Sequence, residues 1–162
     1  MKEILHQHAL YNLWANRRIV DVILPLSGEL HFRHVASSFS SLQLTLLHLW
    51  NTDHIWMQRL NRAETIPLGN EQSTMTEIAA GLIERSRLWG DWVEKSTNES
   101  LEKVFSYQNF KKEPFTQPLF QILLHVFNHA TYHRGQLVTI LRQLGVDNIP
   151  ATDFIVWSRA KK

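Results

Sequence analysis

The sequence contains no cysteine, little glycine or proline, and no long apolar run. The absence of cysteine excludes disulfides, thiolate metal ligands, iron–sulfur clusters and a cysteine nucleophile. Its six Gly and five Pro fall mostly between segments with helical periodicity, which favours an all-α fold. No segment has the roughly 18 consecutive apolar residues of a membrane span, and the N-terminal segment lacks the apolar stretch of a signal peptide. We therefore expect a cytoplasmic protein with no membrane partner.

The charge is nearly balanced. Seventeen Lys and Arg oppose fifteen Asp and Glu, and no block of basic residues occurs, so a nucleic-acid partner is not expected. The chain of 162 residues is 44% hydrophobic and 20% charged, which is typical of one globular domain. We expect residues 1–162 to form a single helical domain.

Hydrophobic periodicity and end signals predict four long helices. They span Lys2–Leu24, about Ser40–Asn61, about Thr74–Lys95 and about Thr116–Leu144. Capping boxes at Ser40/Gln43 and Thr74/Glu77 mark the starts of the second and third helices. Pro118 is placed in the first turn of the fourth helix, which ends before Gly145.

The remaining segments predict smaller features. A short hairpin between the third and fourth helices would pair residues 104–107 with residues 110–115, and residues 152–157 predict a capped turn of helix that buries two aromatic side chains. The connections from Leu24 to Ser40 and from Arg62 to Ser73 exceed the 2 to 8 residues usual between neighbouring helices of a bundle. At least one of them should cross the bundle end, which predicts a four-helix bundle with a crossover connection.

The strongest chemical signal is a set of histidines on two helices. The fourth helix carries His125-x3-His129-x3-His133, and His129 and His133 lie about 40° and 80° around the helix from His125, on its apolar side. His125 lies at the edge of that side. On the second helix the same arithmetic turns His48 inward and His54 outward, while Asp53 is expected to be an exposed carboxylate.

Histidines at positions i and i+4 with a third from a facing helix can supply three nitrogen ligands at roughly 2.0 to 2.1 Å from one metal ion. Three ligands and an open position are typical of catalytic zinc, although imidazole also suits nickel, copper and iron. The alternative is a set of ordinary buried histidines held by hydrogen bonds. The tryptophans at helical spacing, Trp14, Trp50, Trp56, Trp89 and Trp92, are interpreted as packing residues.

Four segments together resemble the DinB family of helical metalloproteins. They are YNLWANRR, SSFSSLQLTLLHLWNTDHIWMQRL, HVFNHATYHRGQL and TDFIVW, which cover nearly the whole chain. The resemblance implies metal ligands at His48, His129 and His133, with nickel or zinc as the ion. It also implies a four-helix bundle of up-down-down-up order and a homodimer.

The resemblance further implies a metal-dependent enzyme that acts on a small molecule, as a hydrolase or as a transferase that uses a low-molecular-weight thiol. Near the metal, we expect His125, Asn51, Thr52 and Gln136 to bind the ligands or the substrate through hydrogen bonds. No side chain is identified as a catalytic acid, base or nucleophile. Two alternatives stay open: a non-enzymatic stress-response dimer with a structural metal, and a dimeric binding module without metal.

Overall fold

The computed structural model describes residues 1–63, 66 and 68–160. In these residues the chain forms seven helices and two strands. Their bounds are α1 Lys2–Ile23, α2 Gly28–Phe32, α3 Leu42–Leu60, α4 Met75–Lys95, α5 Asn98–Glu102, β1 Val104–Gln108, β2 Pro114–Pro118, α6 Leu119–Gln143 and α7 Phe154–Arg159. The mostly helical fold expected from the sequence is therefore confirmed, with one small sheet added.

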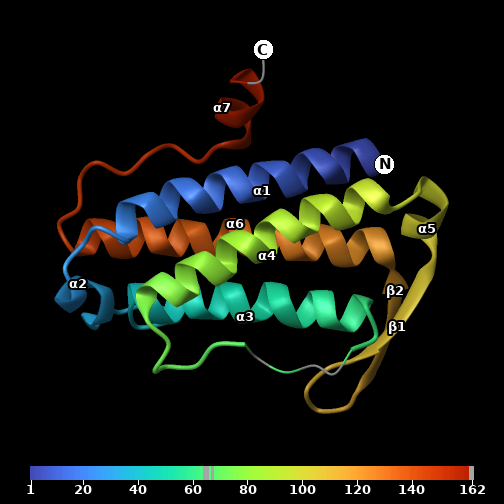
Figure 1. Cartoon of the computed structure of the whole chain (residues 1–162), viewed down its shortest axis with the longest axis horizontal. Coiled ribbons are helices and arrows are strands. Elements are labelled where there is room, and N and C mark those ends of the chain that lie inside the picture. Colours follow the sequence, from blue (N-terminus) through green and yellow to red (C-terminus); the bar gives the residue numbers. More distant parts are fainter. Residues whose placement is uncertain (64–65, 67, 161–162) are drawn as a thin grey trace.

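The four long helices lie side by side (Figure 1). Each of α1 and α3 packs against both α4 and α6. Helices α1 and α6 run in one direction and α3 and α4 in the other, so the chain returns along the length of the helices between the end of α3 and the start of α4. The short helix α7 lies against α1, outside this group.

The ends of the long helices agree with the sequence in part. Helix α4 begins at the expected capping box, in which Thr74 and Glu77 exchange hydrogen bonds. The predicted capping box at Ser40 is wrong, because Ser41 is the N-cap of α3 and its hydroxyl accepts from the Leu44 N–H. The side chain of Gln43 instead donates to the Glu71 carbonyl, 3.0 Å away. The two serines are adjacent and chemically identical, so the sequence does not show which of them is the N-cap. The local backbone conformation decides it.

The start of α6 also differs from the prediction. Thr116 belongs to β2, and Pro118 is the N-cap of α6 rather than a residue of its first turn. The hairpin exists, but β2 begins at Pro114, so that Phe110 lies in the turn and not in a strand. Helix α7 is confirmed as a short C-terminal helix, although it buries only Trp157 fully while Phe154 is half-buried. The sequence did not predict the single turns α2 and α5.

Two apolar clusters fill the space between the long helices. One is centred on Ile19, Leu46, Ile78 and Ile140, and the other on Leu5, Trp89, Ile122 and Val126. Burying each such side chain contributes roughly 1.5 to 3 kcal/mol, so these clusters hold α3 and α6 in register. The middle of these two helices, where polar side chains interrupt the apolar ones, lies between the clusters.

A glycine on α4 allows a close approach to α3. The indole of Trp50 lies so near Gly81 that a Cβ atom there would be 2.2 Å from Trp50 Cε2. Gly69, in the connection between the two helices, approaches the same indole. Trp50 therefore packs into a site that only glycine at position 81 leaves open.

Candidate metal centre

Three histidine side chains, His48, His129 and His133, converge between α3 and α6 and are called the histidine trio below. The Nε2 atom of His129 lies 3.1 Å from Nε2 of His48 and 3.0 Å from Nε2 of His133. One ligand atom from each of the three residues lies within 4.8 Å of the others. A tetrahedral metal with bonds of roughly 2.0 to 2.1 Å separates its ligand nitrogens by about 3.3 Å. The arrangement fits three nitrogen ligands of one ion.

One ring is oriented by a hydrogen-bonded chain. The Nδ1 atom of His133 lies 2.7 Å from Gln136 Oε1, so it carries the proton and leaves the lone pair on Nε2. The Gln136 amide then donates to Ser38 Oγ at 3.0 Å and to Tyr132 Oη at 3.2 Å. Such an outer hydrogen bond fixes the tautomer of a metal-binding histidine. Gln136, which the sequence analysis placed near the cavity, thus contacts a trio member directly.

A ring from the loop before α3 covers the trio. Phe39 stacks on His48 with ring centroids 4.2 Å apart and planes 24° from parallel, and its centroid is 5.6 Å from that of His133. Neither Phe39 nor Ser38 was predicted from the sequence to be part of the site. The helical periodicity that found the histidines carries no information about a loop, so no signal in the sequence singled them out.

The electrostatics keep the three rings neutral. Burial, with a smaller contribution from the nearby His133, lowers the pKa of His48 to about 4. Burial likewise lowers the pKa of His129 to about 3, with smaller contributions from the neighbouring histidines. The pKa of His133 is lowered by burial and partly restored by Gln136. All three imidazoles are unprotonated at neutral pH, which is the state that binds metal ions.

The other residues singled out from the sequence lie around the trio or have different partners. His125 is exposed, with its ring centroid 5.7 Å from that of His129. Thr52, one turn beyond His48, is half-buried. The Asn51 side chain accepts from the Leu68 and Gly69 N–H groups and donates to the Gly69 carbonyl, each at 3.0 Å. Asn51 therefore fastens the connection that follows α3.

A second polar cluster lies in the core and includes residues of α1, α3 and α6. Arg134 is only 2% exposed and donates to the amide oxygens of Asn12 and Asn16 on α1. Asp53 is fully buried, which contradicts the expectation of an exposed carboxylate. Burial raises its pKa to about 7, against the opposing effect of Arg134 and Arg85. His54, expected to point outward, is also buried.

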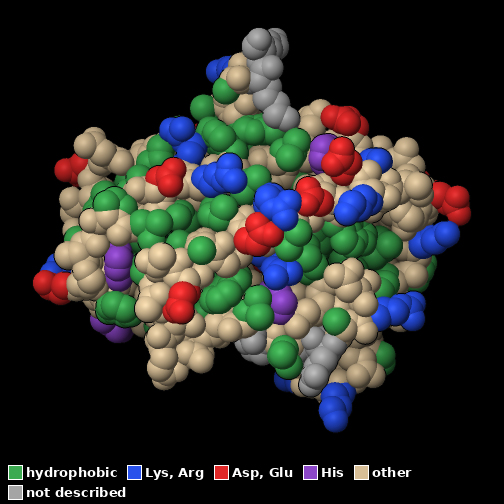
Figure 2. All heavy atoms as spheres, viewed as in Figure 1, with side chains coloured by type: hydrophobic (Ala, Val, Ile, Leu, Met, Phe, Trp, Pro, Cys, Tyr) green, Lys and Arg blue, Asp and Glu red, His purple; other side chains and the backbone are tan. Residues whose placement is uncertain are grey.

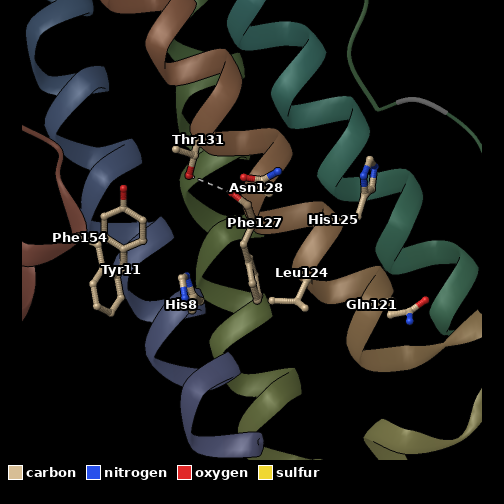
Figure 3. Close-up of a pocket in the computed structure, with 9 residues that line it drawn as sticks. All are labelled: His8, Tyr11, Gln121, Leu124, His125, Phe127, Asn128, Thr131 and Phe154. Atoms are coloured by element: carbon tan, nitrogen blue, oxygen red, sulfur yellow. Dashed lines mark hydrogen bonds between the residues drawn. The ribbon is translucent and has the colours of Figure 1, made fainter.

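The cavity in Figure 3, of about 620 Å³, lies between α6 on one side and α1 with α7 on the other. Tyr11 and His8 of α1 and Phe154 of α7 line one side, and Asn128 of α6 the other. His125 also lines it but lies beside α3, away from Tyr11 and Phe154 (Figure 3). This cavity therefore lies beside the trio without containing any of its three members.

The face of the molecule shown in Figure 2 is mixed in charge. In the view of Figure 2, acidic and basic side chains are interspersed with apolar ones, without a block of one sign. Within the described residues, no helix combines the length and the apolar character needed to span a bilayer.

Comparisons with known proteins decide the family. The model of the DinB family matches residues 1–160. The chain belongs to the DinB family. Protein DinB of Bacillus subtilis (strain 168) is 29% identical over 153 residues, which cover 89% of this chain and 87% of that protein. The family resemblance seen in the sequence is thereby confirmed.

Solved structures of DinB-like proteins share the fold. One from Bacillus cereus ATCC 10987 has a TM-score of 0.71 at 21% identity and covers 92% of this chain and 95% of its own. A DinB-like protein from Bacillus subtilis has a TM-score of 0.66 at 16% identity, covering 92% and 97% of the two chains. In this DinB-family chain, the fold brings together a group of three histidines that could hold a metal ion.

Proposed function

We propose that this DinB-family protein is a metal-dependent enzyme that binds a divalent ion, nickel or zinc, through His48, His129 and His133. The observation that carries the proposal is the convergence of three neutral Nε2 atoms within ligand distance of one another. Within the described residues, no cysteine or carboxylate joins this group. Three protein ligands leave a further coordination position for water or substrate.

The proposed substrate is a small molecule, and the proposed reaction is a hydrolysis or the transfer of a group to a low-molecular-weight thiol. When bound, the ion lowers the pKa of a coordinated water or thiol and so supplies a nucleophile near neutral pH. The residues of the chain bind the ion, orient the His133 ring through Gln136 and exclude water from His48 with the Phe39 ring. The absence of cysteine is consistent with a thiol that comes from outside the chain.

The proposal includes a four-helix bundle of up-down-down-up order as the scaffold. The directions of the four long helices in Figure 1 support it. It also includes a homodimer, for which exposed apolar residues on α6 and α7, such as Leu124 and Ile155, offer contact area.

Metal analysis tests the proposed site. Protein produced without a histidine tag should contain about one divalent ion per chain by mass spectrometry, since one trio binds one ion. The metal content of the His129→Ala variant should be at least about ninefold lower than that of wild type, because the central nitrogen is removed. His34→Ala, which removes an exposed histidine, is the matched control and should retain the metal. Equal metal content in wild type and His129→Ala would refute the site.

A structural role for the ion is the second candidate, because His48 belongs to α3 while His129 and His133 belong to α6. An ion held by all three would cross-link these helices and stabilise the fold. X-ray absorption on the loaded protein separates the two roles. A coordinated water or an added thiol bound to the ion supports the enzyme, whereas a closed site with a large drop in Tm on chelation supports the structural ion.

A further inference from the structure

An arginine at the end of α3 is held among three aromatic rings. The Arg59 Cζ atom lies 4.7 Å from the ring centroid of Trp56, 5.6 Å from that of Tyr107 and 5.3 Å from that of Phe110. These rings come from α3, from β1 and from the turn of the hairpin, which lies near the C-terminal end of α3 (Figure 1). Contacts with several ring faces fix the position of the guanidinium.

This cation has no anionic partner among the residues that the structure describes. None of the ion pairs found there includes Arg59, and its Nε atom is buried without a hydrogen-bond acceptor. The Tyr107 hydroxyl donates to Gln117 Oε1 at 3.0 Å. Burial lowers the pKa of Arg59, yet a guanidinium stays protonated in proteins. Arg59 is therefore a positioned and half-buried charge without a counterion in the part of the chain that the structure describes.

A cavity of about 260 Å³ lies beside this charge. Arg59 and Arg62 line it together with Ser106, Tyr107 and Gln108, and no described carboxylate does. Arg62 has a φ of 54°, a left-handed conformation that is uncommon for a residue with a Cβ atom. Two arginines and polar side chains around a small cavity are suited to an oxyanion, because guanidinium groups bind carboxylate and phosphate through paired hydrogen bonds.

A series of ring contacts along α3 and α6 links the cavity to the histidine trio. Arg59 follows His48 by eleven residues of one helix, which corresponds to roughly 16 Å. Ring contacts span the interval: the centroid of His125 lies 5.7 Å from that of His129 and 5.5 Å from that of Trp56. Trp56 in turn contacts Arg59. A single elongated molecule over these rings could therefore reach both ends.

We propose that the cavity beside Arg59 and Arg62 binds the oxyanion group, a carboxylate or a phosphate, of an elongated substrate whose reacting end lies at the histidine trio. Arg59 supplies the fixed donor, and Arg62 supplies the second charge. The assignment of the reacting end rests on the proposed function, whereas binding of the oxyanion does not. The two residues would determine which substrates the enzyme accepts.

The first experiment titrates metal-free protein with inorganic phosphate and follows the NMR signals of the Arg59 Nε–H group and of the Tyr107 and Gln108 amides. Chelation removes the ion as an alternative phosphate site. We expect saturable shifts at these signals. Arg59→Gln should weaken binding about tenfold and Arg62→Gln about threefold, since each removes charge-assisted hydrogen bonds. Arg17→Gln, at an exposed arginine of α1, is the matched control and should bind as wild type.

Arg59→Gln could loosen the hairpin by removing the contacts with the rings. We therefore also test Arg59→Lys, because lysine retains the charge but not the paired donors. Arg62 is exposed, so Arg62→Gln leaves the three aromatic rings around Arg59 in place. We expect Arg59→Lys to bind phosphate with an intermediate affinity. Absence of saturable shifts in wild type, or equal affinity in Arg59→Gln and Arg17→Gln, would overturn the oxyanion site.

The second experiment distinguishes a substrate group from a free ion. A hydroxamate, which binds metal ions, is joined to a terminal carboxylate by an alkyl chain long enough to span roughly 16 Å. Zinc-loaded wild type should bind it at least about tenfold more tightly than the methyl ester of the same compound, through the higher effective concentration of the tethered group. In the Arg59→Gln variant the carboxylate and its methyl ester should bind with equal affinity.

A ratio of one in wild type, with phosphate still bound in the first experiment, would show a site for a free ion and overturn the substrate assignment. Failure of the metal proposal is recognised separately, because the methyl ester would then show no zinc-dependent binding to wild type.

Discussion

Two consecutive residues of α6 belong to two polar clusters of opposite character. His133 faces α3 and joins a group whose ring nitrogens converge on one another. Arg134 faces α1, where its guanidinium donates to Asn12 and Asn16, and it also donates to Thr131 of its own helix. In the second cluster the guanidinium is held by acceptors of the chain, although Arg134 Nε, Asn12 Nδ2 and both carboxylate oxygens of Asp53 are buried without a hydrogen-bond partner among the described residues. In the first, the Nε2 atoms of three imidazoles converge, and within the described part of the chain the only hydrogen-bond partners of these atoms are one another.

The difference separates a candidate binding site from polar groups of the core. Buried polar groups normally find partners within the protein, as Asn16 does when its amide donates to Ser86 at 2.9 Å. Ring nitrogens whose only partners are one another would all be satisfied by an ion bound between them. Both clusters hold buried atoms without a partner, so burial alone does not distinguish them, whereas the convergence of three like ring nitrogens does.

The largest effect should come from breaking the Arg134 cluster. Arg134→Ala removes one of the two cations that lower the pKa of the buried Asp53 and leaves Asn12 and Asn16 without their donor, and we expect a loss of about 3 to 5 kcal/mol in the free energy of unfolding. Urea denaturation measures it. Arg142→Ala, at an exposed arginine of the same helix, should stay within about 0.5 kcal/mol. The folded fraction of Arg134→Ala should still bind metal. A parallel loss of stability and metal in this variant would mean that the clusters are one unit.

A smaller effect is expected from Gln136, on the metal side of the comparison. Gln136→Leu removes the acceptor that fixes the His133 tautomer, so metal affinity should fall about 10- to 100-fold. Competition with a chromophoric chelator measures the Kd. Gln136→Glu keeps an acceptor and should retain most of the affinity. Equal affinities in Gln136→Leu and wild type would mean that the hydrogen bond does not orient the ligand.

The smallest effect is a difference in pH dependence of the metal-free protein. The pKa of His48 is about 4 in the fold and 6.5 ordinarily, so its stability contribution is lost as the pH falls from 6.5 toward 4. The pKa of Asp53 is about 7 against 3.8, so its contribution is present at low pH and is lost as the pH rises through 7. The two groups oppose each other between pH 4 and 6.5.

Substitution should separate these contributions. Across that interval, Asp53→Asn should lose stability on acidification more steeply than wild type, and His48→Gln less steeply. Urea midpoints at three or four pH values in the presence of a chelator measure the slopes. Identical slopes in all three proteins would show that neither group titrates as the structure indicates.

The sequence predicted best what a single helix determines. His129 and His133 are one turn apart on an apolar face, and this spacing alone implies that their rings meet. The cap at Thr74 is similarly local. Asp53 was misjudged because its surroundings, which include the charges of Arg134 and Arg85, come from other helices. A carboxylate next to polar neighbours in one helix gives no sign that distant cations will surround it.

The parts of the site that come from loops could not be predicted. Phe39 reaches His48 because the segment before α3 folds back over the trio, and no periodicity describes that segment. Two of the three rings around Arg59, Tyr107 and Phe110, come from the hairpin, whose second strand starts at Pro114 and not at Phe110. The predicted strand began four residues too early, so Phe110 was assigned to a strand and not to the turn, from which it contacts Arg59.

The contact between Trp50 and Gly81 couples the packing of α4 to the position of α3 beside the candidate metal centre. Trp50 follows His48 by two residues, and a Cβ atom at position 81 would lie 2.2 Å from its indole. Even a methyl group there would displace the indole and the stretch of α3 that carries His48, so a residue that is not itself a candidate ligand helps to set where one imidazole lies.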